Sequence, residues 1–239
     1  MYKYLLFDLD DTLLDFKKAE ETAIKTVLAD FNIAPTDENI LLYSKINDTY
    51  WKRFERGEIE KSEIFKNRFK TLAQELKVML PVETVSRRYF EELSKCGFVF
   101  DGAGQMLKYL YNSHVICAAT NGELNTQKSR IKKSGLEKYF NGGIFISEQV
   151  GFQKPNAEYF EFILDKLKNP EKKDVLVIGD SPSSDILGAN NAGLDSCFIN
   201  FRGNVTPEGI NPTYSVTSYS ELVSIVSQKR PSNSRTDMF

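Results

Sequence analysis

The chain has 239 residues, 41% of them apolar and 27% charged, and a formal net charge of −2. This composition is that of an ordinary globular protein, and the length suits an α/β domain with a smaller second domain. Acidic and basic residues are interleaved, which argues against a basic surface for a nucleic acid polymer and leaves recognition to a local site.

The sequence shows no apolar run near the roughly 20 residues that a membrane helix needs, and Asp8 interrupts the first apolar stretch too early for a secretory signal. The three cysteines, Cys96, Cys117 and Cys197, are far apart in the chain. Their number and spacing favour a reducing cytoplasm over a disulfide framework or a zinc site. We expect Cys117 and Cys197 to be buried in strands, because both lie in apolar runs.

Short apolar runs separated by helical stretches predict the core of the protein. The first run, Tyr4-Leu5-Leu6-Phe7, predicts a buried strand that ends at Asp8. Further strands are predicted at 115–119, 175–178 and 196–199, with a weaker candidate at 144–146. This alternation predicts an α/β fold with a Rossmann-like parallel sheet covered by helices on both faces. We assign residues 1–15 and 96–229 to this core.

Residues 16–95 show helical spacing and no convincing strand. Their apolar residues recur in steps of three and four along four stripes: Phe16, Ala19, Ala23 and Val27; Tyr43, Ile46, Tyr50 and Phe54; Phe65, Phe69, Leu72 and Leu76; and Tyr89, Phe90 and Leu93. Such steps are typical of amphipathic helices. The segment is therefore predicted to be an all-helical cap domain inserted after the first strand. The polar residues 230–239 carry no periodicity and predict a disordered tail.

The segment Asp8-Leu9-Asp10-Asp11-Thr12 directly follows the first strand. Ligand sites of parallel α/β sheets form beyond the carboxyl ends of the strands, so Asp8 and Asp10 are placed where a site is expected. Two neighbouring carboxylates suit nucleophilic and acid–base chemistry, and they also attract a hard cation such as Mg²⁺. The alternative is an acidic turn without a catalytic role.

Three further polar segments follow or lie near predicted strand ends. Asp180 and Asp185 follow the strand at 175–178, although Asp180 or Ser181 alone would also suit a helix cap. Thr120 and Asn121 follow the strand at 115–119, where a hydroxyl and backbone N–H groups suit phosphate oxygens or, alternatively, a helix cap. Lys154 is the weakest of these signals alone, because a single lysine is usually solvated.

Other enzyme classes are poorly supported by the sequence. His114 is the only histidine, and we expect it on the surface at the start of a strand. A Ser-His-Asp site would rest on this residue alone. The sequence contains no GxxxxGK[ST] motif of P-loop nucleotidases and no dinucleotide-binding glycine pattern.

In combination, these segments resemble the haloacid dehalogenase superfamily. Four motifs carry the resemblance over the region from Tyr4 to about Asn200: DxDx[T/V] at Asp8, Asp10 and Thr12; a strand-end Thr or Ser at Thr120; a Lys at Lys154; and GDSxxxD at Asp180 and Asp185. The helical insert is similar to the cap of one branch of that superfamily. Asp10 argues for phosphate chemistry, because dehalogenases of the superfamily lack this second aspartate.

The resemblance implies a mechanism. Asp8 would be the nucleophile, and Asp10 would protonate the leaving oxygen and then activate the water that cleaves the aspartyl-phosphate. Thr120, Asn121 and Lys154 would bind the phosphoryl group. The expected partner is a small phosphate ester, and the chain is expected to be a monomer or a weak dimer.

The resemblance also implies a Mg²⁺ site. The ligands would be a carboxylate oxygen of Asp8, the backbone carbonyl of Asp10, and Asp180. Asp185 would orient these groups from one helical turn further along. Positioning and charge neutralisation are the main requirements of phosphoryl transfer.

The cap residues Asn47, Trp51 and Arg68 are the candidates for substrate specificity. Their spacing resembles bacterial pyrimidine 5′-nucleotidases that act on noncanonical nucleotides, and it is also similar to sialic acid 9-phosphate phosphatases. Trp51 is expected to stack on a base, and Asn47 or Arg68 to bond to it. The alternative is that Trp51 packs in the cap and Arg68 is a surface residue. A phosphosugar mutase and a non-catalytic binding protein remain as other functions.

Overall fold

The computed structural model describes residues 2–201, 203 and 207–228. These residues form a six-stranded sheet in the order β3-β2-β1-β4-β5-β6. Every pair of neighbouring strands is parallel. The strands are β1 (Tyr4–Phe7), β2 (Val115–Thr120), β3 (Gly143–Ile146), β4 (Val175–Gly179), β5 (Asp195–Ile199) and β6 (Tyr214–Val216). The prediction of an α/β fold built on a parallel sheet is therefore confirmed.

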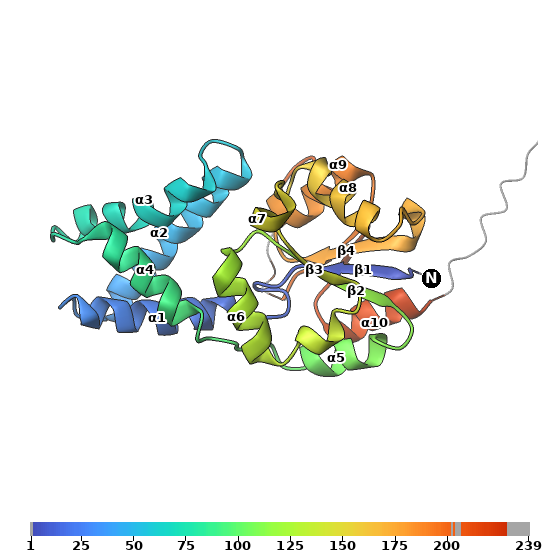
Figure 1. The fold of residues 1–239 in the computed structure, drawn as a ribbon, viewed down its shortest axis with the longest axis horizontal. Helices are drawn as coiled ribbons and strands as arrows, with labels where there is room; N and C mark the ends of the chain where they lie inside the picture. The colour runs from blue at the N-terminus through green and yellow to red at the C-terminus, as the bar shows by residue number, and fades with distance from the viewer. Residues whose placement is uncertain (1, 202, 204–206, 229–239) are drawn as a thin grey trace, which may run out of the picture.

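Helices cover both faces of this sheet. Figure 1 shows α8 and α9 on one side of it and α5 and α10 on the other. Because side chains alternate along a strand, Leu5 and Phe7 pack on the face covered by α5 and α10, and Leu6 packs on the other face. The helices of the core are α5 (Ala103–Leu110), α6 (Leu124–Ser134), α7 (Ser147–Val150), α8 (Ala157–Lys166), α9 (Leu187–Ala192) and α10 (Tyr219–Ser227), with short turns η1 (Glu137–Tyr139), η2 (Lys172–Asp174) and η3 (Pro182–Ile186).

The segment after β1 forms a helical lobe with its own hydrophobic cluster, which we call the cap (Figure 1). Three fully buried rings lie at its centre: Tyr43 stacks on Phe69 at 5.3 Å between ring centroids, and Tyr89 lies 5.6 Å from Phe69. The helices are α1 (Phe16–Asp30), α2 (Asp37–Glu55), α3 (Lys61–Glu75) and α4 (Val82–Leu93). Each of the four predicted apolar stripes falls on one of them, Leu76 lying just past the end of α3.

Two segments connect the cap to the core, and they pair with each other. Leu14 forms a β-bridge with Val99, and the N–H of Asp15 donates to the carbonyl of Phe98 at 3.1 Å. The strands run toward the cap, so their carboxyl ends face it (Figure 1). The fold therefore places the strand-end motifs between the two lobes.

Two expectations need correction or extension. His114 was expected on the surface, but it is only 5% exposed, and its Nδ1 lies 3.2 Å from the carbonyl of Leu110. The edge strand β6 was not predicted, because three residues are too few to show an alternating pattern. Cys117 and Cys197 are buried in strands as predicted. The predicted tail at 230–239 lies outside the described residues.

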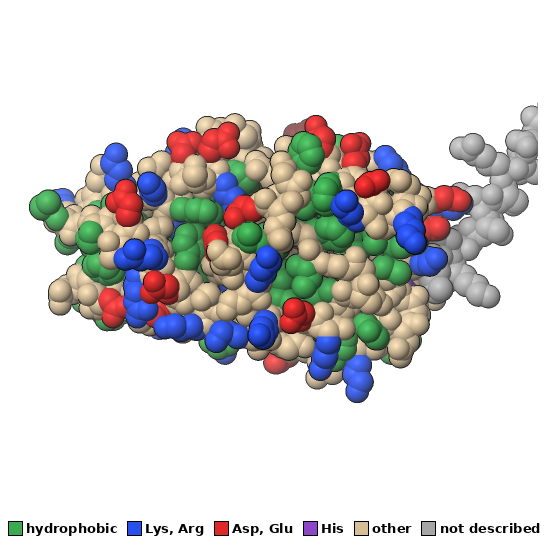
Figure 2. Space-filling model, in the orientation of Figure 1, with side chains coloured by type: hydrophobic (Ala, Val, Ile, Leu, Met, Phe, Trp, Pro, Cys, Tyr) green, Lys and Arg blue, Asp and Glu red, His purple; other side chains and the backbone are tan. Residues whose placement is uncertain are grey.

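Acidic and basic side chains are intermixed over both lobes on the face seen in Figure 2. Within the described part of the chain, no helix is both long and apolar enough to span a bilayer.

Candidate active site

Three neighbouring strands bring the predicted motifs together. Thr120 ends β2, Asp8 follows β1, and Asp180 follows β4, in the spatial order β2-β1-β4. The backbone N–H of Asp8 still donates to the carbonyl of Ile178 in β4 at 2.8 Å, so Asp8 is held in register with the sheet. The motifs, far apart in sequence, thus share one edge of the sheet.

Lys154 lies at the centre of this edge and is 2% exposed. Its Nζ donates to Oδ1 of Asp8 and to Oδ1 of Asp185, each at 2.6 Å, and to the carbonyl of Ala119 at 2.9 Å. Asn121 fixes the backbone of Lys154 with two hydrogen bonds, of 2.8 and 3.0 Å. Asn121 therefore holds the lysine in place here.

The charges at this site do not balance. Burial raises the pKa of Asp8 to about 8; Lys154 opposes this shift, and the negative charges of Asp185 and Asp10 add to it. A buried cluster with more carboxylates than cations favours protonation, unless a further positive charge is present. A cation beside Asp8 would therefore keep it ionised, as a nucleophile must be.

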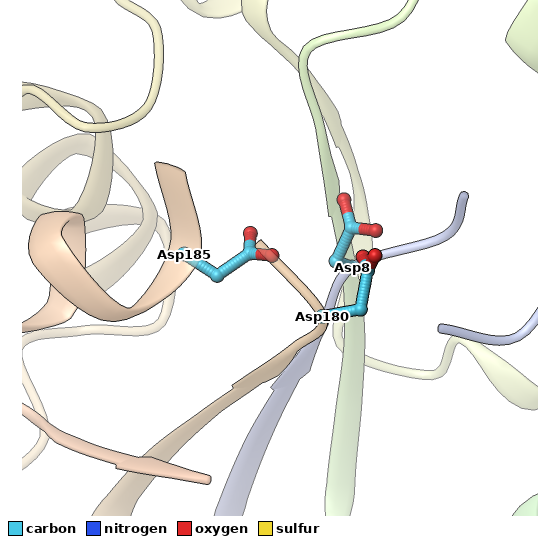
Figure 3. Close-up of side chains that lie close together, drawn as sticks. All are labelled: Asp8, Asp180 and Asp185. Atoms are coloured by element: carbon cyan, nitrogen blue, oxygen red, sulfur yellow. The ribbon is translucent and has the colours of Figure 1, made fainter. Parts of the chain in front are cut away.

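The arrangement of carboxylates fits a metal ion. One oxygen from each of Asp8, Asp180 and Asp185 lies within 4.8 Å of the others, and Figure 3 shows the three side chains grouped together. Burial raises the pKa of Asp180, and the charge of Asp8 adds to that shift. Carboxylate oxygens are the ligands that hard divalent cations prefer. Thr12 donates to Oδ1 of Asp180 at 3.3 Å.

Asp185 differs from the other two because both of its oxygens already have partners. Oδ1 accepts from Lys154, and Oδ2 accepts from the backbone N–H of Ser181 at 3.1 Å. The carboxylate of Asp185 also lies very close to the backbone of Gly179, since a Cβ added to this glycine would be 2.1 Å from Oδ2 of Asp185. The glycine at the end of β4 therefore makes room for this carboxylate.

Asp10 is held by two residues that the sequence analysis did not single out. The buried Arg130 forms an ion pair with Oδ1 of the partly exposed Asp10, and Gln127 donates to Oδ2 at 2.9 Å. Gln127 also donates to the hydroxyl of Thr120 at 2.8 Å and accepts from Arg130 at 2.9 Å. One chain of hydrogen bonds thus connects Asp10 to the end of β2.

A sequence signal for these two residues exists but is faint. Gln127 and Arg130 are three residues apart in the helix that directly follows Thr120, so they share one face. That face is buried although the side chains are polar. A polar pair on the buried face of a helix after a strand-end motif is the pattern that would have identified them.

The predicted cap residues do not contact the carboxylate cluster in the described structure. Asn47 donates to Oε1 of Glu20 at 2.7 Å and accepts from Nη1 of Arg68 at 2.8 Å. Arg68 is 2% exposed and stacks on four aromatic rings, the nearest being Tyr89 at 4.6 Å. Trp51 is half-buried and meets Phe54 edge-on at 5.7 Å.

A cleft of about 600 Å³ lies between the cap and the core. Phe65 and Phe90 line its cap side, with their ring centroids 4.8 Å apart. Glu123 and Asn125 line its core side, directly after the turn that contains Thr120. Its size is that of a small-molecule site.

Comparison with known proteins identifies the family. The family model of haloacid dehalogenase-like hydrolases matches residues 2–193. The HAD-hydrolase YfnB of Bacillus subtilis is 37% identical over 94% of this chain and 95% of its own. Its magnesium-bound crystal structure, described as revealing interdomain movement, matches with a TM-score of 0.90 and 35% identity over 95% of this chain and 99% of that chain.

Two further relatives are pyrimidine 5′-nucleotidases. PynA of Streptococcus pneumoniae is 37% identical over 93% of this chain and 94% of its own. YjjG of Escherichia coli is 32% identical over 92% of this chain and 96% of its own. The chain therefore belongs to the haloacid dehalogenase-like hydrolases, and the resemblance drawn from its motifs is confirmed.

We predict that Gly179→Ala lowers the free energy of unfolding by about 1–3 kcal/mol, because the new methyl group overpacks against Asp185. Gly104→Ala is the matched control, since its Cβ would meet only Leu136 at 3.8 Å. Urea unfolding of both variants measures the difference. Equal changes in the two variants would contradict the close approach described for Asp185.

We predict that Arg130→Met lowers kcat about 10- to 100-fold, part of the 10²–10⁴ that a well-placed acid–base group contributes. The reason is that Asp10 loses the cation that fixes its orientation. Steady-state kinetics on 4-nitrophenyl phosphate measure the effect, and Lys128→Met, on the exposed face of the same helix, is the control. A large change in KM with an unchanged kcat would assign Arg130 to substrate binding instead.

Proposed function

We propose that the protein is a magnesium-dependent phosphomonoester hydrolase that works through an aspartyl-phosphate on Asp8. The observation that carries this proposal is that the two carboxylates at the end of β1 have different partners. Asp8 is bonded to Lys154, and Asp10 is paired with Arg130 and Gln127. Two neighbouring carboxylates in different surroundings are suited to different roles.

In the first step, an oxygen of Asp8 attacks phosphorus and the bond to the ester oxygen breaks. Asp10 gives its proton to that leaving oxygen, so the alcohol departs neutral. Asp8 then carries the phosphoryl group as an acyl phosphate. Lys154 donates to Asp8, and Thr120 ends the neighbouring strand β2, so phosphoryl oxygens on Asp8 would accept hydrogen bonds from both.

In the second step, Asp10 takes a proton from water, and the resulting nucleophile attacks phosphorus. The bond between phosphorus and the Asp8 oxygen breaks, which releases phosphate and restores the Asp8 carboxylate. Asp10 ends protonated, ready for the next turnover. Gln127 and Arg130 orient the Asp10 carboxylate, and the contact to the oxygen that carries the proton opens while Asp10 is protonated.

Magnesium would be held by carboxylate oxygens of Asp8 and Asp180 and by the backbone carbonyl of Asp10, and it would neutralise negative charge on the phosphoryl group. Asp185 would orient the site through Lys154 and Ser181 rather than bind the ion, because both of its oxygens are occupied.

For the substrate, we propose a pyrimidine nucleoside 5′-monophosphate, the class named in PynA and YjjG. The cleft between the lobes offers the aromatic rings of Phe65 and Phe90. Its lining includes Glu123 and Asn125, which follow Thr120 in the chain, but none of Asp8, Asp10, Thr120, Lys154 and Asp180. Trp51, the other candidate for stacking on a base, is half-buried in the cap. Stacking on an aromatic side chain contributes about 1–3 kcal/mol per base.

Arg68 is buried in the cap among aromatic rings and does not line the cleft. Among the described residues, its Nε and Nη2 have no hydrogen-bond partner, whereas both atoms of the Asn47 amide are engaged. The guanidinium lies over Phe65 and Phe90, the two rings that line the cleft. We therefore propose that Asn47 and Glu20 position Arg68, and that Arg68 acts on the base by holding these two rings.

We predict that Asp8→Asn abolishes turnover and that Asp10→Asn lowers kcat about 10²- to 10⁴-fold, with both variants folded. Phosphate release from 4-nitrophenyl phosphate with Mg²⁺ measures both, and a panel of nucleotides and sugar phosphates extends the test to substrates. More than a few per cent of activity in an Asp8→Asn sample free of deamidation would contradict the nucleophile assignment.

We predict that Trp51→Ala or Phe65→Ala selectively weakens hydrolysis of uridine 5′-monophosphate, by about tenfold or more in kcat/KM, because a stacking contact is lost. Hydrolysis of 4-nitrophenyl phosphate serves as the internal comparison, and Leu41→Ala, an exposed change in α2, is the control. Parallel loss on both substrates with a lower melting temperature in both variants would place these rings in the cap core and remove support for a nucleotide.

A further inference from the structure

The loop between α2 and α3 lies on the side of the cap that faces the core (Figure 1). We call residues Glu55–Lys61 the hairpin tip. Its two ends carry opposite charges, and each contacts a different loop of the site. These contacts are separate from the two connecting segments through which the chain enters and leaves the cap.

Glu55, at the end of α2, contacts the loop of the metal ligands. Its carboxylate accepts hydrogen bonds from the hydroxyls of Ser183 and, at 3.4 Å, of Ser181. Both serines lie between Asp180 and Asp185 in the chain, and the backbone of Ser181 donates to Asp185. A carboxylate of the cap is therefore bonded to the segment that sets the spacing of these two aspartates.

Lys61, at the start of α3, contacts the phosphate-binding turn. Its Nζ donates to the carbonyl of Gly122 at 2.8 Å and to the hydroxyl of Ser147 at 3.3 Å, and it pairs with Glu148 at 2.7 Å. The side chain is only 12% exposed. Gly122 also bonds to Thr120 through its backbone N–H, so the lysine acts on the same turn that presents the Thr120 hydroxyl.

Arg56 and Glu58 of the hairpin tip pair locally, and Glu60 caps α3. Glu58 pairs with Arg56 at 2.5 Å and with Arg53 at 3.4 Å, and all three side chains are at least 40% exposed. Exposed pairs of this kind contribute little to stability. They mark Glu55 and Lys61 as the two charges of this segment that bridge to the core, and they offer control positions.

We propose that Glu55 and Lys61 are positioning residues, each of which holds a different loop of the site. Glu55 sets the loop of Asp180 and Asp185, and hence the affinity for the cation. Lys61 sets the turn at Thr120 and Gly122, and hence the affinity for the phosphoryl group. This inference rests on the proposed function for the identity of the two ligands. It adds that docking of one cap segment completes both halves of the site.

The test uses the full chain and two binding measurements that need no turnover. Titration calorimetry measures Mg²⁺ binding, and then binding of inorganic phosphate at saturating Mg²⁺. Glu55→Ala should weaken Mg²⁺ binding about tenfold, the size of one hydrogen bond to a charged group, and leave phosphate binding within about twofold. Lys61→Met should show the reverse pattern. Glu58→Ala should change neither affinity.

Conservative variants separate positioning from simple loss of folding. Glu55→Gln keeps an acceptor for the serines, and Lys61→Arg keeps a donor for Gly122, so both should recover most of the lost affinity. Unchanged affinities in Glu55→Ala and Lys61→Met, or equal losses of both ligands in both variants, would overturn the inference. A wild-type protein that binds both ligands but hydrolyses no phosphate ester would instead overturn the proposed function alone.

Discussion

The buried contact of Lys154 with Asp8 and Asp185 is the interaction on which the site depends. An ammonium group that is 2% exposed must have partners, and two carboxylates so close together must have a cation. Lys154 neutralises one of the two negative charges of Asp8 and Asp185, and one negative charge remains in excess. Burial raises the pKa of Asp8, and the negative charges of Asp185 and Asp10 add to this shift. The excess negative charge also suits the site to a divalent ion.

Three neighbouring strands, β2, β1 and β4, supply the polar groups around this cluster. The end of β1 supplies the carboxylates of Asp8 and Asp10, the end of β2 supplies the hydroxyl of Thr120, and the end of β4 supplies the carboxylate of Asp180. Gln127 and Arg130 extend this arrangement from a helix and restrain Asp10. A parallel sheet thus fixes the positions of the groups, and the helices fix their orientations.

The sequence predicts the strands and helices, because their apolar residues follow a local pattern. Alternating apolar runs identified five of the strands, and helical stripes identified all four cap helices. The bonds from Arg130 to Asp10 and from Lys61 to Gly122 were not predictable, because they join elements far apart in sequence and leave no periodic trace. His114 was misplaced because the polar residues beside it suggested exposure, whereas the side chain is buried and its Nδ1 lies 3.2 Å from the carbonyl of Leu110.

The pairing of Leu14 with Val99 has a consequence for how the chain folds. β1 lies in the middle of the sheet, and the whole cap separates it in sequence from its partner β2. Closing so long a loop costs entropy and slows the pairing of parallel strands. α1 and α4 pack together within the cap, and this brings the two connecting segments side by side. A cap that forms early would shorten the loop and act as a template for the central strand, so mutations in its core should slow refolding of the sheet as well.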